Sequence, residues 1–173
     1  MEDKIKVLIS EEELAKRIGE IADQINEEYA GEEVHLICIL KGSVFFTTAL
    51  ASRLKMPVTM DFMSVSSYGN ETVSSGRIKI LKDLDESIRD KNVIVVEDII
   101  DSGRTLSHLM SFLSVREPKT LKLCALLDKP DRREIPVNVD YIGMQIPDLF
   151  VVGYGLDYAQ KYRNLPYIGV IEQ

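Results

Sequence analysis

The sequence predicts an α/β fold with a largely parallel central sheet flanked by helices, and three observations support this class. Short, almost continuously apolar segments of strand length alternate with segments of helical periodicity. Most of the apolar segments end in polar residues or glycine, as strands do where a parallel sheet meets its loops. The length of 173 residues allows a full core for one domain and is short for two. We therefore expect residues 1–173 to form a single domain.

The first predicted helix follows Ser10, which has the capping-box spacing to Glu13. Apolar residues then recur at helical spacing from Leu14 to Ile25. Gly31 provides the stop signal. These features indicate an amphipathic helix that covers one face of the sheet.

The other expected elements follow in chain order. The apolar runs predict six strands: VHLICIL (34–40), PVTMDFMSV (57–65), IKIL (78–81), NVIVVED (92–98), TLKLCALLD (120–128) and VDYIGM (139–144). A further segment, 150–158, begins like a strand. Helices are expected at 43–54 and 105–116, and the polar segment 66–77 with its two glycines predicts a loop.

Composition and charge exclude several classes of function. With 21 basic and 28 acidic residues the net charge is −7, which opposes general binding to nucleic acids or anionic membranes. No apolar run is long enough to cross a bilayer, and the start MEDKIKVLIS lacks a secretory signal, so we expect a cytoplasmic protein. Cys38 and Cys124 lie in apolar runs and are expected to be buried free thiols. His35 and His108 are isolated and expected to be packed or surface residues.

One segment, VIVVEDIIDSGRT (93–105), carries candidate chemistry. Glu97 and Asp98 stand near the carboxyl end of a strand, where they could accept from ribose hydroxyls or bind a hard cation. The loop from Asp101 onwards supplies backbone N–H groups, hydroxyls and a helix N-terminus, which together can hold a phosphate. Gly103 permits a left-handed turn and a close approach.

Each half of this segment has a simpler explanation when taken alone. Paired acids also occur at solvated strand ends and in receiver domains, and an Asp-Ser-Gly turn can be a plain helix cap. The contiguous pattern is more specific than either half. No Walker loop is present, and Gly153-x-Gly155 is not a dinucleotide fingerprint because Tyr158 stands where the third glycine is needed.

The run VVEDIIDSGRT (95–105) resembles the phosphoribosyl pyrophosphate (PRPP) motif of type I phosphoribosyltransferases, in its hypoxanthine-guanine form. Four further segments resemble the family in the same order: LKGS (40–43), SSYGN (66–70), LLDKP (126–130) and FVVGYGLDYAQKYR (150–163). The resemblance covers almost the whole chain. It implies the type I phosphoribosyltransferase fold, with a small hood from both chain ends and a flexible lid at 66–77. It also implies a cis peptide between Lys41 and Gly42.

The implied reaction transfers the 5-phosphoribosyl group from PRPP to a purine and releases diphosphate, with Asp101 as the general base toward purine N7. The 5′-phosphate would be held by Asp101, Ser102, Gly103, Arg104 and Thr105, with the side chain of Arg104 contributing little. The ribose would be held by Glu97 and Asp98, which together with Asp157 would also contact Mg²⁺. The diphosphate would be held by Lys41, Gly42 and Arg163. The purine would be bound by Lys129, Phe150, Val151 and Asp157, and the lid contacts would be Ser67 and Tyr68.

Lys129 can only donate hydrogen bonds, so the resemblance implies a purine with a carbonyl at position 6, namely hypoxanthine or guanine rather than adenine. Phe150 would stack on this purine, or it is merely a core residue. Two other functions stay open: a xanthine-preferring transferase, and a regulator of this fold that binds nucleic acid, which should have a basic face. The resemblance also implies a homo-oligomer, either a dimer or a tetramer.

Overall fold

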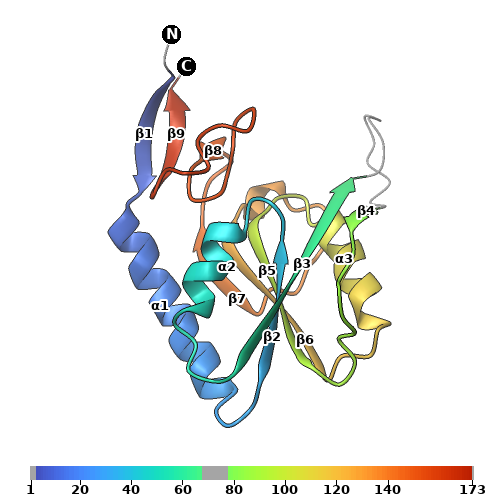
Figure 1. The fold of residues 1–173 in the computed structure, drawn as a ribbon. Helices are drawn as coiled ribbons and strands as arrows, with labels where there is room; N and C mark the ends of the chain where they lie inside the picture. The colour runs from blue at the N-terminus through green and yellow to red at the C-terminus, as the bar shows by residue number, and fades with distance from the viewer. Residues whose placement is uncertain (1–2, 68–77, 173) are drawn as a thin grey trace.

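The computed structural model describes residues 3–67 and 78–172 of the chain. Its centre is a six-stranded sheet in the order β4-β3-β2-β5-β6-β7, in which β4 is antiparallel to β3 and all other neighbours are parallel. Helices α1 (Glu11–Glu28) and α2 (Val44–Ala51) cover one face, and α3 (Arg104–Ser114) covers the other (Figure 1). The strands of this sheet are β2 (Val34–Ile39), β3 (Val58–Ser67), β4 (Ile78–Lys82), β5 (Asn92–Ile100), β6 (Thr120–Asp128) and β7 (Tyr141–Gln145). The prediction of a largely parallel α/β sheet is confirmed.

Two apolar clusters, one on each face, bury this sheet. The cluster beneath α1 contains that helix's apolar stripe from Leu14 to Ile25, and the other cluster contains the stripe of α3. Strand β2 is buried at all six positions, as its nearly continuous apolar sequence predicts, and the one polar residue, His35, is buried too. The predicted cap of α1 is also present, because Ser10 Oγ accepts from the Glu13 N–H at 3.1 Å. Cys38 and Cys124 are both buried as free thiols.

A second sheet, which we call the terminal sheet, joins the two ends of the described chain in the order β1-β9-β8. Strand β1 (Lys4–Ile9) pairs antiparallel with β9 (Ile168–Glu172), and β9 pairs with β8 (Val151–Val152). Sequence analysis did not predict β1 or β9. Strand β1 is short and mostly exposed, and the alternation of Ile5, Val7 and Ile9 was not used as a strand signal in the sequence analysis.

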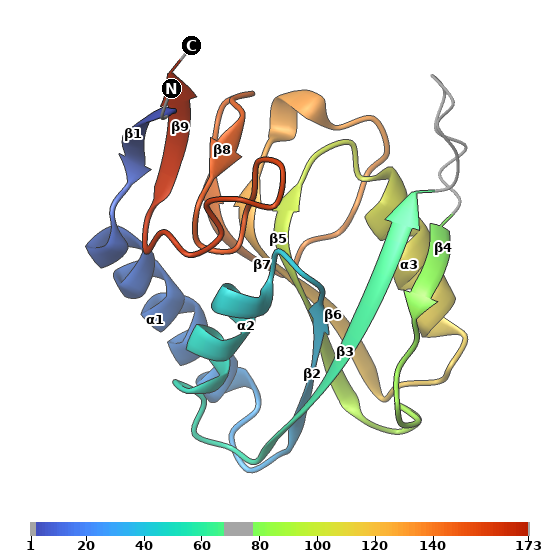
Figure 2. The same cartoon turned by 45° about the horizontal axis from the view of Figure 1, so that its top comes forward.

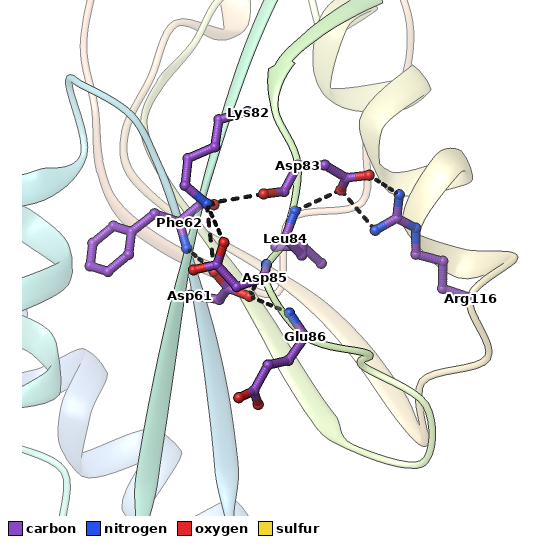
Figure 3. A network of polar contacts seen from close by, with 8 residues as sticks. All are labelled: Asp61, Phe62, Lys82, Asp83, Leu84, Asp85, Glu86 and Arg116. Atoms are coloured by element: carbon purple, nitrogen blue, oxygen red, sulfur yellow. Dashed lines mark hydrogen bonds and ion pairs between the residues drawn. The ribbon is translucent and has the colours of Figure 1, made fainter.

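Polar contacts fix the edge of the central sheet at β4 (Figure 3). The buried carboxylate of Asp61 accepts from the Asp85 N–H at 2.8 Å, which holds the β4–β5 connection against β3. Lys82 Nζ donates to the Asp83 carbonyl at 3.0 Å. The Asp83 carboxylate in turn accepts two hydrogen bonds from the Arg116 guanidinium, at 2.8 and 2.7 Å. The chain after β4 is thereby attached to the segment that follows α3.

The structure corrects several expected boundaries. Strand β3 continues through Ser67 because Ser66 and Ser67 pair with β4, so these two residues are not part of a loop. The rest of the expected lid, including Tyr68, lies outside the described residues. Strand β5 continues to Ile100, two residues beyond the acid pair, because it pairs with β6 as far as Asp128.

Two further corrections concern the ends of α3 and the peptide near Lys41. Helix α3 starts at Arg104, one residue earlier than expected, because Gly103 makes the turn that caps it. It ends at Ser114, two residues short of the expected end, and the chain then turns through Glu117 at φ 59°. The cis peptide joins Leu40 to Lys41, so the expected position between Lys41 and Gly42 is wrong. No proline follows either bond, and the sequence therefore gives no local mark of which one is cis. Among the described residues, no helix is long and apolar enough to span a membrane.

Candidate active site

Most of the described site residues expected from the sequence lie at or just after the carboxyl ends of the parallel strands β2, β5 and β6. The carboxyl ends of parallel strands share one edge of a sheet, and loops from that edge form the usual ligand site of α/β folds. The terminal sheet lies at the same end of the molecule (Figure 2). Residues far apart in the sequence therefore come together at this edge.

The loop after β5 forms a small hollow above the start of α3. A cavity of about 140 Å³ is lined by the backbone and side chains of Asp101, Ser102, Gly103 and Thr105, with Glu97 at its side. Gly103 has φ 83°, and a methyl group there would come within 2.5 Å of the Ile135 carbonyl oxygen, so the turn requires glycine. The N-terminus of an 11-residue helix opens into this loop, which favours an anion.

The guanidinium of Arg104, the first residue of α3, forms an ion pair with Glu134. Ser67, at the end of β3, lies close to the same loop, with 3.3 Å between its hydroxyl and that of Thr105. Strand β3 thus ends beside the anion-binding hollow.

The acid pair on β5 is packed against the loop that follows β2. Asp98 lies so close to Gly42 that a methyl group on Gly42 would be 1.8 Å from Asp98 Oδ2. The backbone N–H of Asp98 donates to Glu97 Oε1 at 3.0 Å. Burial, together with the neighbouring charge of Asp98, raises the pKa of Glu97 well above its ordinary value. An arriving cation would favour the ionised form of this pair.

A second group of charges lies on the segment after β8. Arg163 forms an ion pair with Asp157 at 3.2 Å and donates to Gln160 Oε1 at 3.1 Å. Lys41 Nζ donates to the same Gln160 oxygen at 3.4 Å. The structure therefore brings Lys41, Arg163 and Asp157 together, as expected. Sequence analysis missed Gln160, because a neutral amide gives no signal beyond its position between Asp157 and Arg163.

A glycine contact holds this segment against the loop after β2. A methyl group on Gly155 would lie 2.0 Å from the Gly42 carbonyl oxygen, so the two loops touch through their backbones. Arg163 Nη1 also donates to the Gly155 carbonyl at 2.7 Å. The lysine and the arginine are thus held near each other by loops that are themselves in contact.

Lys129 is almost buried and lies between two carboxylates. Its Nζ is 3.6 Å from Asp101 Oδ1 and 3.9 Å from Asp148 Oδ1, and the residue is 9% exposed. The contact with Asp101 joins the residue expected to select the purine, Lys129, to the expected general base. Sequence analysis missed Asp148, because a lone acid after a Pro-containing turn resembles any surface carboxylate.

Phe150 is 59% exposed, so the alternative that it is a core residue is wrong. Its ring meets that of Tyr158 edge to face, with centroids 5.8 Å apart and planes at 83°. Val151, by contrast, is buried within β8. The exposed Phe150 ring can stack on a planar ligand. Tyr158 was not among the expected site residues, since one tyrosine in an aromatic-containing segment carries no separate signal.

The donor set suits a magnesium ion that is shared with a substrate. Across residues 3–67 and 78–172, no three histidine, cysteine, aspartate or glutamate side chains gather into a closed metal site. Glu97 and Asp98 offer carboxylate oxygens at one place, and Asp157 is engaged with Arg163. Magnesium uses one or two carboxylates and completes its shell with waters and substrate oxygens, so this sparse set fits it.

Comparison with known proteins gives a consistent result. A family model described as the phosphoribosyl transferase domain matches residues 8–159. The chain is 51% identical over 173 residues to a hypoxanthine phosphoribosyltransferase of Buchnera aphidicola, covering 99% of this chain and 98% of the relative. It is also 51% identical to the hypoxanthine phosphoribosyltransferase of Escherichia coli K12, covering 99% and 97%. A crystal structure of a Bacillus anthracis hypoxanthine-guanine phosphoribosyltransferase superposes with a TM-score of 0.94 at 52% identity, covering 99% of this chain and 100% of that one.

Proposed function

The chain belongs to the phosphoribosyl transferase family, among its hypoxanthine phosphoribosyltransferases, and on this premise we propose how its residues carry out the reaction. It is a purine salvage enzyme that transfers the 5-phosphoribosyl group from PRPP to hypoxanthine, and to guanine, giving IMP or GMP and diphosphate. The observation that carries the residue assignment is the meeting of an anion-binding loop, an acid pair and a buried lysine at one edge of the sheet.

The 5′-phosphate binds in the hollow after β5. Ser102, Gly103 and Thr105 line this hollow and α3 begins beside it, so backbone N–H groups of the loop and the positive end of the helix would supply the hydrogen bonds and partial charge that a phosphate needs. Glu97 and Asp98 accept from the ribose hydroxyls. Lys41, the Gly42 backbone and Arg163 bind the diphosphate, which is supported by the shared contact of both cations with Gln160.

Magnesium is the proposed cofactor, held by Glu97 and Asp98 with Asp157 nearby. When bound, it neutralises charge on the diphosphate and so makes this group a better leaving group. The rest of the reaction depends on side chains of the chain itself. A purine ring nitrogen attacks the anomeric carbon, the bond from that carbon to the diphosphate oxygen breaks, and the diphosphate leaves with the electron pair.

Asp101 receives the proton from purine N7 as this attack proceeds. Its contact with Lys129 places a positively charged donor beside this carboxylate. The ribosyl centre carries positive charge in the transition state, by analogy with other glycosyl transfers, so water must be kept from it. We propose that the part of the expected lid that follows β3, with Tyr68, closes over the site beside Ser67, and that the terminal sheet forms the small hood.

Lys129 selects the purine. Its ammonium donates to a carbonyl at position 6, which hypoxanthine and guanine have and adenine lacks. Because Lys129 is nearly buried, a purine with an amino group at this position would leave a charged donor facing another donor. Phe150 stacks on the ring, and the backbone of Val151 contacts its edge.

Three further proposals concern the whole protein. A cytoplasmic location is supported by two cysteines that are both buried as free thiols. The chain is proposed to form a homo-oligomer, either a dimer or a tetramer, and light scattering on the purified protein distinguishes the two. Residues 1–173 are proposed to act as a single domain.

An assay with PRPP and magnesium against hypoxanthine, guanine, xanthine and adenine tests the assignment. We expect turnover of the first two and none of adenine. Asp101→Asn should lower kcat by about 10² to 10⁴, the usual contribution of a general base. Xanthine as the best substrate would overturn the purine specificity, and an unchanged kcat in Asp101→Asn would overturn the role of Asp101.

A further inference from the structure

A buried ion pair lies directly behind the phosphate loop. Asp128, the last residue of β6, is 4% exposed and forms an ion pair with Arg133 Nη2. A buried carboxylate without a cationic or hydrogen-bonding partner is costly, so this arginine is needed where it stands. Arg133 also makes a second contact, with the backbone of the loop after β5, which is not needed to neutralise Asp128.

Arg133 Nε donates to the backbone carbonyl of Asp101 at 3.2 Å. The stem of the same side chain lies against Gly103, since a methyl group there would be 2.9 Å from Arg133 Cδ. One planar guanidinium therefore joins the end of β6 to the first peptide of the loop after β5. A lysine carries its donors on one nitrogen, so it cannot reproduce the planar fork in which Nε and Nη2 bind separate oxygens.

The next peptide of the loop is held from the same side. The Ser102 carbonyl accepts from the Glu134 N–H at 2.9 Å and from the Ile135 N–H at 3.1 Å. In a planar trans peptide the carbonyl and the following N–H point in opposite directions. Fixing the carbonyls of Asp101 and Ser102 toward residues 133–135 therefore turns the N–H groups of Ser102 and Gly103 the opposite way, away from that segment.

We propose that Arg133 is a positioning residue for phosphoribosyl transfer. It holds the Asp101–Ser102 peptide so that the Ser102 N–H is available to the 5′-phosphate and the Asp101 side chain keeps its place beside Lys129. Its positive charge on the Asp101 carbonyl also polarises that peptide, which makes the Ser102 N–H a stronger donor. This role rests on the proposed function of the loop, and Arg133 exerts it through the loop backbone.

Arg133→Lys tests the proposal, because it keeps a cation for Asp128 and removes the two-pronged contact. We expect KM for PRPP to rise about tenfold and kcat to fall about tenfold to a hundredfold, the range that small misplacements of a reacting group produce. KM for hypoxanthine should change less than about twofold, since the Lys129 backbone is held independently by its bond to the Ile100 carbonyl. Binding of IMP, measured by calorimetry, should weaken in parallel with KM for PRPP.

A matched control is available at the far side of α3. Arg116 also forms a two-pronged pair with an aspartate, Asp83, but it lies in the network at β4 (Figure 3). Arg116→Lys should lower the melting temperature and leave kcat and both KM values unchanged. The double variant Asp128→Asn/Arg133→Gln removes both charges of the ion pair, so no unpaired Asp128 carboxylate is left behind. Any effect that it shares with Arg133→Lys can then be attributed to loss of the loop contact.

The outcomes are distinct. A wild-type protein without turnover would overturn the proposed function. If the wild type is active and both Arg133→Lys and the double variant are folded and kinetically normal, the positioning role of Arg133 is overturned while the proposed function stands. A lower melting temperature with unchanged KM and kcat per folded molecule would also overturn it, because Arg133 would then be structural only. Raised KM for PRPP and weakened IMP binding in both variants would support it.

Discussion

Gly42→Ala should damage catalysis by displacing Asp98, and the size of the effect can be worked from the structure. The added methyl would lie 1.8 Å from Asp98 Oδ2. A carbon and a carboxylate oxygen need roughly 3.2 Å, so the carboxylate or the loop must shift by more than about 1 Å. Misplacement of about 1 Å at a reacting centre costs up to about a hundredfold in rate. We expect kcat/KM for PRPP to fall by about that factor.

The same substitution should have a moderate effect on stability. Gly42 does not have a positive φ, so alanine causes no backbone strain, and overpacking alone costs about 1 to 3 kcal/mol. Steady-state kinetics over a range of PRPP and magnesium, together with urea unfolding, measures both quantities. Gly19→Ala is the control, because nothing lies within 4 Å of a methyl group there and alanine favours the helix.

A double-mutant cycle isolates the cause. In an Asp98→Ala background the carboxylate is gone, so Gly42→Ala should have little further effect on kcat/KM. Two variants whose losses simply add would refute the reasoning, because the damage would then come from the loop and not from the displaced acid. Wild-type activity in Gly42→Ala would refute it as well.

The remaining predictions concern specificity, the phosphate loop and pH. Lys129→Gln should lower kcat/KM for hypoxanthine by about 10² or more and reduce the ratio of kcat/KM for hypoxanthine to that for adenine, since an amide can accept as well as donate. The four-purine assay measures both quantities. Gly103→Ala should destabilise the protein by about 2 to 4 kcal/mol in urea unfolding, through its φ of 83° and its contact with Ile135. Burial, with the charge of Lys91, lowers the pKa of His35 against the opposing effects of Asp61 and Glu86. The folded state then disfavours the proton, so stability is complete above the ordinary pKa of 6.5 and is lost as pH falls below it. His35→Gln should lose less stability between pH 7.5 and pH 5.5 than the wild type, and an equal loss would contradict this reasoning.

The central sheet could be predicted because its strands are marked locally. Segments such as 34–40 and 120–128 are largely apolar, since helices cover both faces of the sheet. The acid pair and the phosphate loop are contiguous in sequence, so their chemistry could also be predicted. Strands β1 and β9 of the terminal sheet could not, because β1 is held by pairing with a strand at the opposite end of the chain, and only the family resemblance implied a hood from both ends. Nothing in its own residues specifies that partner.

The missed site residues have a common physical reason. Gln160, Asp148 and Arg133 act through contacts with other side chains or with backbone groups from distant segments. Their residue types are ordinary at a protein surface, and only the folded arrangement gives them a place. Gly42 and Gly155 belong to the same class, because their lack of a side chain matters only where two loops touch.

The net charge of −7 does not describe the local distribution of charge at the proposed binding site for an anionic substrate. On the purine and diphosphate side, carboxylates are matched by cations: Asp157 by Arg163, Asp128 by Arg133, and Asp101 and Asp148 by Lys129. Glu97 and Asp98 instead contact each other and backbone N–H groups. Of the carboxylates named here, Glu97 and Asp98 are the ones without a cationic partner among the described residues. A divalent cation bound there would supply positive charge where the chain itself has none, so the proposed binding of magnesium is compatible with the acidity of the chain.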